Sequence, residues 1–210
     1  ADEGSYSWHC PGHSGGVAFL KSPLGQMFHQ FFGENMLRAD VCNAVDELGQ
    51  LLDHIGPVAA SERNAARIFS ADHLFFVTNG TSTSNKIVWH ATVAPGDIVV
   101  VDRNCHKSVH HGVILSGARP IYLDSSVNRK YGLFGPVPRA TVLAAIAQHP
   151  DARALILTSC TYDGLRYDLK PIIEAAHAAG IKVIVDEAWY GHARFHPALR
   201  PTALESGADY

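Results

Sequence analysis

The chain has 210 residues, a formal net charge of −3, an apolar fraction of 47% and a charged fraction of 18%. This length can bury a sizeable core, and the composition is ordinary for a globular protein. The slightly acidic balance leaves no basic footprint, so nucleic acid is excluded as an expected partner. We find no apolar run long enough to cross a bilayer and no opening signal peptide, so no membrane role is expected.

The cysteines give an expectation about the compartment. Four are scattered along the chain without CxxC spacing, at Cys10, Cys42, Cys105 and Cys160. That pattern favours reduced thiols in a cytoplasmic protein over a disulfide framework or a zinc ribbon.

Residues 1–40 contain many Gly and Pro residues, which predicts an irregular N-terminal arm with one short helix rather than a domain. Their aromatic side chains, among them Phe28, Phe31 and Phe32, need something to cover them. A second subunit of a homo-oligomer is one candidate. Residues 41–210 are then expected to form part of one large domain.

Two helical patterns follow the arm. The first places Val45, Leu48, Leu52 and Ile55 on one face and stops at Gly56, before Pro57. The second covers residues 59–69.

From residue 73 onwards, apolar runs typical of buried strands alternate with helical patterns. Strands are predicted at 74–77, 97–101, 120–123, 154–158 and 182–185, and helices at 82–93, 107–115, 138–149 and 169–179. Such alternation predicts an α/β fold with a mostly parallel sheet covered by helices on both faces.

The first of these strands leads into a glycine-containing turn and then a helix. Gly80 is followed by Thr81 and Ser82 at the expected helix start. Free backbone N–H groups, the positive end of the helix dipole and two hydroxyls favour a phosphate site. Ordinary N-capping by Thr81 or Ser82 is the alternative.

The second strand is followed by His106, whose imidazole could stack on a flat ring or shuttle a proton. His106 and His110 also have the i,i+4 spacing of two metal ligands on one helix face. No Glu follows His106 as a HExxH motif requires, and no third ligand is suitably spaced, so no metal is expected. A solvated helix face is the simpler interpretation of His110 and His111.

The last two strands end on Thr158 and on Asp186, which is followed by Ala188 and Trp189. Carboxyl ends of parallel strands meet at the edge of the sheet where ligands bind. The pattern therefore predicts that hydroxyls, an imidazole and a carboxylate gather at one rim. Capping of the following loop is the alternative for Asp186.

These motifs resemble the major domain of the bacterial-type ornithine/lysine/arginine decarboxylases, which are pyridoxal-phosphate-dependent enzymes of fold type I. The matching runs are Pro11-Gly12-His13-Ser-Gly15-Gly16, Phe31-Phe32-Gly33, Thr78-Asn79-Gly80-Thr81-Ser82-Thr-Ser-Asn85, Asp102-Arg-Asn-Cys-His106-Lys-Ser108, Thr161-Tyr162-Asp163-Gly164 and Asp186-Glu-Ala188-Trp189. The likeness covers nearly the whole chain, and the run from Asp102 to Ser108 is its most specific part.

The resemblance implies decarboxylation of arginine, lysine or ornithine to the amine and CO2, with pyridoxal 5'-phosphate as cofactor. It assigns the cofactor phosphate to Thr81 and Ser82, and ring stacking to His106. The remaining cofactor contacts that it implies are Asp186 at the ring nitrogen, Ala188 on the opposite ring face, Trp189 near the phenolic oxygen and Thr158 as a neighbour of the ring.

In the family, the cofactor is attached through a Schiff-base lysine shortly after a segment like 206–210. The six lysines here are Lys21, Lys86, Lys107, Lys130, Lys170 and Lys182, and none follows Asp186. The chain is therefore expected to be a fragment, without the wing domain, the last strands and the C-terminal domain, and to be inactive alone.

Two other functions keep the same fold. One is a catalytically dead homologue that acts as a binding or regulatory protein, and the other is an aminotransferase or lyase of fold type I. An intact phosphate site together with His106 and Asp186 argues against the first, and the run from Asp102 to Ser108 argues against the second.

Overall fold

The computed structural model describes residues 10–42 and 46–210, and the chain divides into two compact units, Ala1–Ala65 and Ala66–Tyr210. Each unit is described by itself. The predicted division into an arm of residues 1–40 and a partial domain of residues 41–210 stays a prediction.

The described part of the first unit is more helical than expected. Its 3-10 helix η1 (Val17–Lys21) leads into α1 (Pro23–Phe32) and α2 (Glu34–Ala39), so the prediction of a single short helix is wrong. Ser22 explains the start of α1, because its side chain accepts a hydrogen bond from the Gly25 N–H, and Pro23 is tolerated in the first turn. Gly33, with φ of 80°, separates the two helices.

The helix predicted from the apolar pattern at 45–55 is also wrong. Val45 lies outside the described residues; beyond it there is only a short 3-10 helix, η2 (Asp46–Leu48), followed by turns. Positive φ angles at Gly49 and His54 break any helix there. The following helical prediction is confirmed by α3 (Gly56–Phe69), which runs from the first unit into the second.

The second unit is built on a four-stranded sheet of order β2-β1-β5-β6, in which every neighbouring pair is parallel. Its strands are β1 (Ile98–Asp102), β2 (Arg119–Leu123), β5 (Ala154–Thr158) and β6 (Lys182–Asp186). The helices are α4 (Thr81–Thr92), α5 (Lys107–Ser116), α6 (Arg139–Gln148) and α7 (Leu169–Ala178).

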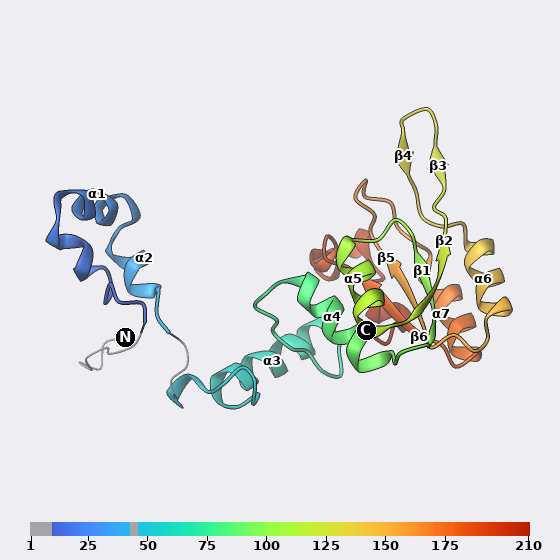
Figure 1. The fold of residues 1–210 in the computed structure, drawn as a ribbon, viewed down its shortest axis with the longest axis horizontal. Coiled ribbons are helices and arrows are strands. Elements are labelled where there is room, and N and C mark those ends of the chain that lie inside the picture. Colours follow the sequence, from blue (N-terminus) through green and yellow to red (C-terminus); the bar gives the residue numbers. More distant parts are fainter. Residues whose placement is uncertain (1–9, 43–45) are drawn as a thin grey trace. The chain divides into compact units, whose positions relative to one another are not determined.

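Helices cover both faces of this sheet, as the alternation predicted (Figure 1). Val99 and Val101 of β1 pack with Trp89 of α4 on one face. Val100, between them, packs on the other face with Ile172 of α7. This division follows from the two-residue period of a strand, which sends successive side chains to opposite faces.

The expected first strand does not form. Residues 74–77 have no strand assignment and do not join the sheet. An apolar run becomes a strand only where a neighbouring strand offers its backbone, and in the described residues the β6 edge is bonded by another segment. There, Val185 donates its N–H to the Tyr210 carbonyl at 2.9 Å, and Tyr210 donates to Val183 at 3.2 Å.

Several short elements were not predicted at all. A two-stranded antiparallel hairpin, β3 (Val127–Asn128) and β4 (Leu133–Phe134), extends beyond the sheet after β2 (Figure 1). Short 3-10 helices follow β6: η3 (Gly191–Phe195), η4 (Pro197–Leu199) and η5 (Leu204–Ser206). Among the described residues, no helix has the length and apolar character needed to span a membrane.

Candidate active site

The order in which the chain adds strands to the sheet reverses between β1 and β5. After β1 the chain crosses to β2 on one side, and it later returns to place β5 on the other side of β1. In open α/β sheets, ligands bind outside the strand ends at such a point. A pocket of about 260 Å³ lies there, lined by Gly80, Thr81, Ser82, Asn85, His106, Thr158, Cys160, Tyr162, Asp186, Ala188 and Trp189.

This pocket brings together all seven site residues predicted from the sequence. They come from the first turn of α4, the start of α5, the last residues of β5 and β6, and the loop after β6. The structure thus places them at one rim, while their individual roles toward a ligand stay predictions.

The start of α4 leaves hydrogen-bond donors for a ligand. Its N-cap is Gly80, with φ of 76° and no side-chain cap, so capping by Thr81 or Ser82 is not what these hydroxyls do. Thr83 and Ser84 donate their N–H groups to the Gly80 carbonyl. In the described part of the chain, no hydrogen bond engages the N–H of Thr81 or Ser82. Such a helix start suits an anion.

Asp186 ends β6 with a buried carboxylate that is 6% exposed. Its Oδ1 accepts a hydrogen bond from the Ala188 N–H at 3.1 Å, and its Oδ2 accepts one from Asn85 Nδ2 at 3.0 Å. A carboxylate can accept about four hydrogen bonds, so capacity remains on the pocket side. The negative charge suits a protonated ring nitrogen or another cationic group.

His106 is the N-cap of α5 and lies in the pocket wall with its ring half-buried. Its Nδ1 accepts a hydrogen bond from the Ser108 N–H at 3.2 Å and lies 2.8 Å from Ser108 Oγ. A backbone N–H can only donate, so the ring proton of the neutral imidazole belongs on Nε2. These contacts fix the orientation of the ring in the pocket wall and leave the Nε2–H group as its hydrogen-bond donor.

Thr158 adds a polar atom that the chain itself does not satisfy. The side chain is buried, and its Oγ1 has no hydrogen-bond partner within residues 10–42 and 46–210. Leaving such a hydroxyl unpaired costs free energy, so this atom fits a ligand group that the pocket is built to receive. Tyr162 and Trp189, which also line the pocket, meet edge to face with ring centroids 6.3 Å apart.

The histidines that suggested a metal have other contacts. His110 Nδ1 lies 3.1 Å from the Tyr122 hydroxyl and its Nε2 lies 3.5 Å from Cys105 Sγ, so His110 is not simply a solvated side chain. His111 is exposed on the same helix. Burial, and then the nearby Asp102 carboxylate, raise the pKa of the Cys105 thiol to about 12. No group of three His, Cys, Asp or Glu residues suited to a metal occurs in the described part of the chain.

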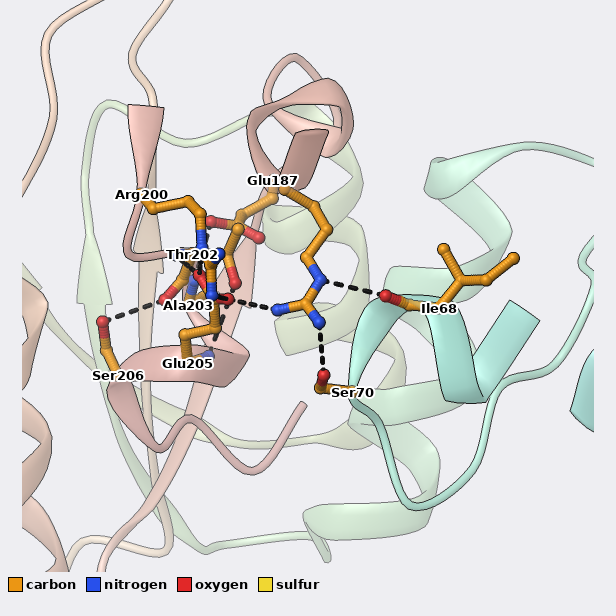
Figure 2. A network of polar contacts seen from close by, with 9 residues as sticks. Ile68, Ser70, Glu187, Arg200, Thr202, Ala203, Glu205 and Ser206 are labelled. Carbon is orange, nitrogen blue, oxygen red and sulfur yellow. Dashed lines mark hydrogen bonds and ion pairs between the residues drawn. The ribbon is translucent and has the colours of Figure 1, made fainter. Parts of the chain in front are cut away.

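A network of polar contacts connects the residues that follow Asp186 in the sequence (Figure 2). The Glu187 carboxylate accepts a hydrogen bond from the Ala203 N–H at 2.9 Å. Glu205 forms ion pairs with Arg194 and Arg200. Arg194 also donates to the Ile68 carbonyl at 2.9 Å, so the end of α3 is tied to the same loop.

Four further lining residues were not predicted as site residues: Gly80, Asn85, Cys160 and Tyr162. Asn85 was detectable, because it lies one helical turn after Thr81 and therefore on the same face of α4. Cys160 and Tyr162 follow β5 in an irregular loop, where no periodicity indicates which side chains face the rim.

Comparison with known proteins identifies relatives along almost the whole chain. The family model described as Orn/Lys/Arg decarboxylase, major domain, matches residues 1–209. Lysine decarboxylase LdcA of Pseudomonas aeruginosa is 51% identical over 207 residues, which cover 92% of this chain and 27% of that protein. The biodegradative arginine decarboxylase of Escherichia coli is 42% identical, covering 94% of this chain and 28% of that protein. The chain thus spans less than a third of these relatives.

Solved structures agree. Lysine decarboxylase A from Pseudomonas aeruginosa superposes with a TM-score of 0.79 at 48% identity, covering 98% of this chain and 29% of that one. The Francisella novicida lysine decarboxylase LdcF superposes with a TM-score of 0.80 at 37% identity, covering 96% of this chain and 29% of that one. A serine palmitoyltransferase from Sphingomonas wittichii, with a TM-score of 0.56 at 19% identity, shares the fold alone. From the family-model match over residues 1–209 and the agreement with solved lysine decarboxylases, this chain belongs to the Orn/Lys/Arg decarboxylase family.

Proposed function

We propose that this chain is the cofactor-binding part of an enzyme that decarboxylates a basic amino acid, arginine, lysine or ornithine, with pyridoxal 5'-phosphate. The observation that carries this is the pocket in which the open first turn of α4, the His106 ring and the Asp186 carboxylate face one space. The named activities of its relatives support the same reaction.

The residues present fit this cofactor. A phosphate group suits the hydroxyls and unengaged N–H groups of Thr81 and Ser82, at the positive end of the α4 dipole. Thr158 offers an unsatisfied hydroxyl beside the buried strand ends. His106 and Ala188 would pack against the ring, and Trp189 would lie near the phenolic oxygen.

Asp186 would hold the proton on the ring nitrogen. When bound, pyridoxal phosphate supplies an electron sink for the electron pair left behind as CO2 departs. A neighbouring carboxylate favours the charged form of a nitrogen base. The hydrogen bonds from Ala188 and Asn85 fix the orientation of this carboxylate and compensate its burial.

Covalent attachment of the cofactor needs a lysine from elsewhere. Lysine is absent from the residues lining the pocket in the described chain. Because the chain covers less than a third of its relatives, we propose that the complete protein supplies this group and that the 210 residues alone release no CO2. Release of CO2 from lysine, arginine or ornithine by the isolated chain, above a no-protein control, would contradict this.

The test of the proposed function uses the complete protein. With pyridoxal phosphate present, CO2 release is measured for L-lysine, L-arginine and L-ornithine, with L-norleucine as an uncharged control of similar length. We expect release from at least one of the three and none from norleucine. Pyridoxal phosphate binding without decarboxylation would instead favour a binding protein, and transfer of the amino group would favour an aminotransferase.

The complete protein is also proposed to be a homo-oligomer. Helix α1 exposes large apolar side chains, with Leu24 at 77%, Met27 at 67% and Phe31 at 82%. A contiguous apolar face of this kind is typical of an interface. Light scattering should give a mass of two subunits or more, and Phe31→Asp should lower it; a monomeric wild-type protein would contradict the proposal.

A further inference from the structure

Two buried polar side chains lie between the groups assigned to the cofactor. Asn85 on α4 is 6% exposed, and Ser108 on α5 is 1% exposed. Asn85 Nδ2 donates to Asp186 Oδ2 at 3.0 Å and to Ser108 Oγ at 2.8 Å. Ser108 Oγ lies 2.8 Å from His106 Nδ1. A continuous hydrogen-bonded chain therefore joins the carboxylate to the imidazole across α4, α5 and β6.

The carboxylate and the imidazole at the two ends of this series of hydrogen bonds fix the donor and the acceptor in each bond. An ionised carboxylate only accepts, so the amide nitrogen of Asn85 must face Asp186, and its second N–H is available for Ser108 Oγ. The Ser108 hydroxyl is then left to donate its own proton to His106 Nδ1, which also accepts from the Ser108 N–H at 3.2 Å. His106 must carry its proton on Nε2, and no hydrogen bond engages Nε2 in the described part of the protein.

We propose that Asn85 and Ser108 are positioning residues that act as one unit. They align the Asp186 carboxylate and hold the His106 imidazole in its Nε2–H form. The proposal rests on the proposed function, because it concerns the two groups that would hold the cofactor ring. Satisfied buried networks of this kind rigidify a site, whereas partly satisfied ones are costly.

A merely structural role predicts different behaviour. If Asn85 and Ser108 only joined α4 to α5, their loss would lower thermal stability without a specific effect on the ligand. The chain offers a matched control in Ser116, a second buried serine of α5, 4% exposed, whose hydroxyl donates to the Val113 carbonyl within the helix.

The sharpest variant is Asn85→Asp, which keeps the shape but replaces the amide donor with a second carboxylate beside Asp186. At neutral pH, the affinity of the complete apoprotein for pyridoxal phosphate should fall about 10- to 100-fold. Two adjacent carboxylates cannot both ionise freely, so as the pH falls from about 8 to 5 one takes up a proton and can donate again. The affinity of Asn85→Asp relative to Asn85→Ala should therefore rise in acid.

Dividing the affinity of Asn85→Asp by that of Asn85→Ala removes the contribution of other groups near Asp186 that titrate in this pH range. His106 is such a group, and it is present in both variants. Burial raises the pKa of Cys105 to about 12, and burial followed by Asp186 raises the pKa of Tyr162, so neither loses a proton in this range. An affinity ratio that stays flat with pH, or an Asn85→Asp protein that binds as well as wild type at neutral pH, would overturn the proposal.

A double-mutant cycle tests whether the two residues act together. Asn85→Ala should weaken binding about 10- to 100-fold and Ser108→Ala about 3- to 10-fold, while the double variant should be no weaker than Asn85→Ala alone. Ser116→Ala should bind like wild type. Effects that add in the double variant, or an equal loss in Ser116→Ala, would contradict a shared role.

Failure of this inference can be told apart from failure of the proposed function. If wild-type protein neither binds pyridoxal phosphate nor releases CO2, the proposed function is wrong and the inference falls with it. If wild type does both and the Asn85 and Ser108 variants match Ser116→Ala, only the positioning role is wrong. Thermal unfolding of each apoprotein separates misfolded variants. Should Asn85→Ala not fold, Asn85→Asp, which preserves side-chain volume, takes its place in the double-mutant cycle, and the pH dependence of Asn85→Asp is compared with that of wild type.

Discussion

Thr158 and Thr92 form a natural pair at the scale of single residues. Both are buried, and both have a hydroxyl without a hydrogen-bond partner in the described chain, but Thr158 lines the pocket and Thr92 does not. An unsatisfied buried hydroxyl is destabilising, so replacing either by valine should leave apoprotein stability unchanged or raise it by about 1 kcal/mol. Only Thr158→Val should also weaken pyridoxal phosphate binding, about 3- to 10-fold.

Chemical unfolding and cofactor titration of the two variants check this prediction. Equal cofactor affinity in Thr158→Val and Thr92→Val would show that the Thr158 hydroxyl does not face the ligand.

Asp186 should matter more for catalysis than for phosphate anchoring. A nearby opposite charge shifts the proton affinity of a base by about 1–3 pKa units, so Asp186→Asn should lower kcat about 10- to 1000-fold. Asp186→Ala should be at least as damaging, since asparagine keeps the shape but loses the charge. The matched control is Asp151, an exposed residue just before the amino end of β5, whereas the pocket lies at the carboxyl end. A kcat for Asp186→Asn equal to that of Asp151→Asn would contradict this.

The candidate site could be predicted from the sequence wherever a regular element ends. Thr158 and Asp186 end strands and His106 follows one, so the strand pattern alone brings these three to one rim. Thr81 lies at a helix start, but the strand predicted before it does not form. The family resemblance supplied their proposed roles. Ser108 was quoted only as part of a motif, because the sequence does not show which side chains donate to one another.

At the scale of elements, close packing of α4 on α5 depends on Gly112. A Cβ at this position would lie 2.5 Å from Cδ1 of Trp89, which is fully buried. Gly112→Ala should therefore destabilise the protein by about 1–3 kcal/mol, because the indole has no room to yield. Gly191, where a Cβ would meet nothing within 4 Å, is the control. Denaturant unfolding of the two variants should separate them; equal midpoints would contradict this packing.

The elements that differ from the sequence prediction do so for three separate physical reasons. Residues 74–77 are apolar but do not join the sheet, since strand formation needs a backbone partner that a pattern cannot show. The β3–β4 hairpin is only two residues long on each strand, too short for a period-two signal. At 45–55 the apolar spacing is helical, but Gly49 and His54 adopt positive φ.

At the scale of the whole second unit, Glu205 links distant segments. Together with Arg194, it connects the loop after β6 to the end of α3, through Ile68 and through Ser70 at 2.6 Å (Figure 2). The hydrogen bond from Arg200 holds the pKa of Glu205 at about 2, below its ordinary value of 4.5. Its contribution to stability is therefore present above pH 4.5 and is lost as the pH falls towards 2.

Glu205→Gln tests this connection. Near neutral pH the variant should be less stable than wild type by about 1–3 kcal/mol, and the difference should shrink in acid as Glu205 takes up a proton. Urea unfolding at several pH values measures it, with the exposed Glu174→Gln as the control. A difference independent of pH would contradict the account of the network.

The most direct test of the central claim is a crystal structure of the complete protein with pyridoxal phosphate. We predict the phosphate at the first turn of α4, against Thr81 and Ser82, with the ring beside His106 and its nitrogen within hydrogen-bond distance of Asp186. A cofactor bound elsewhere, or bound here with its nitrogen facing away from Asp186, would contradict the account.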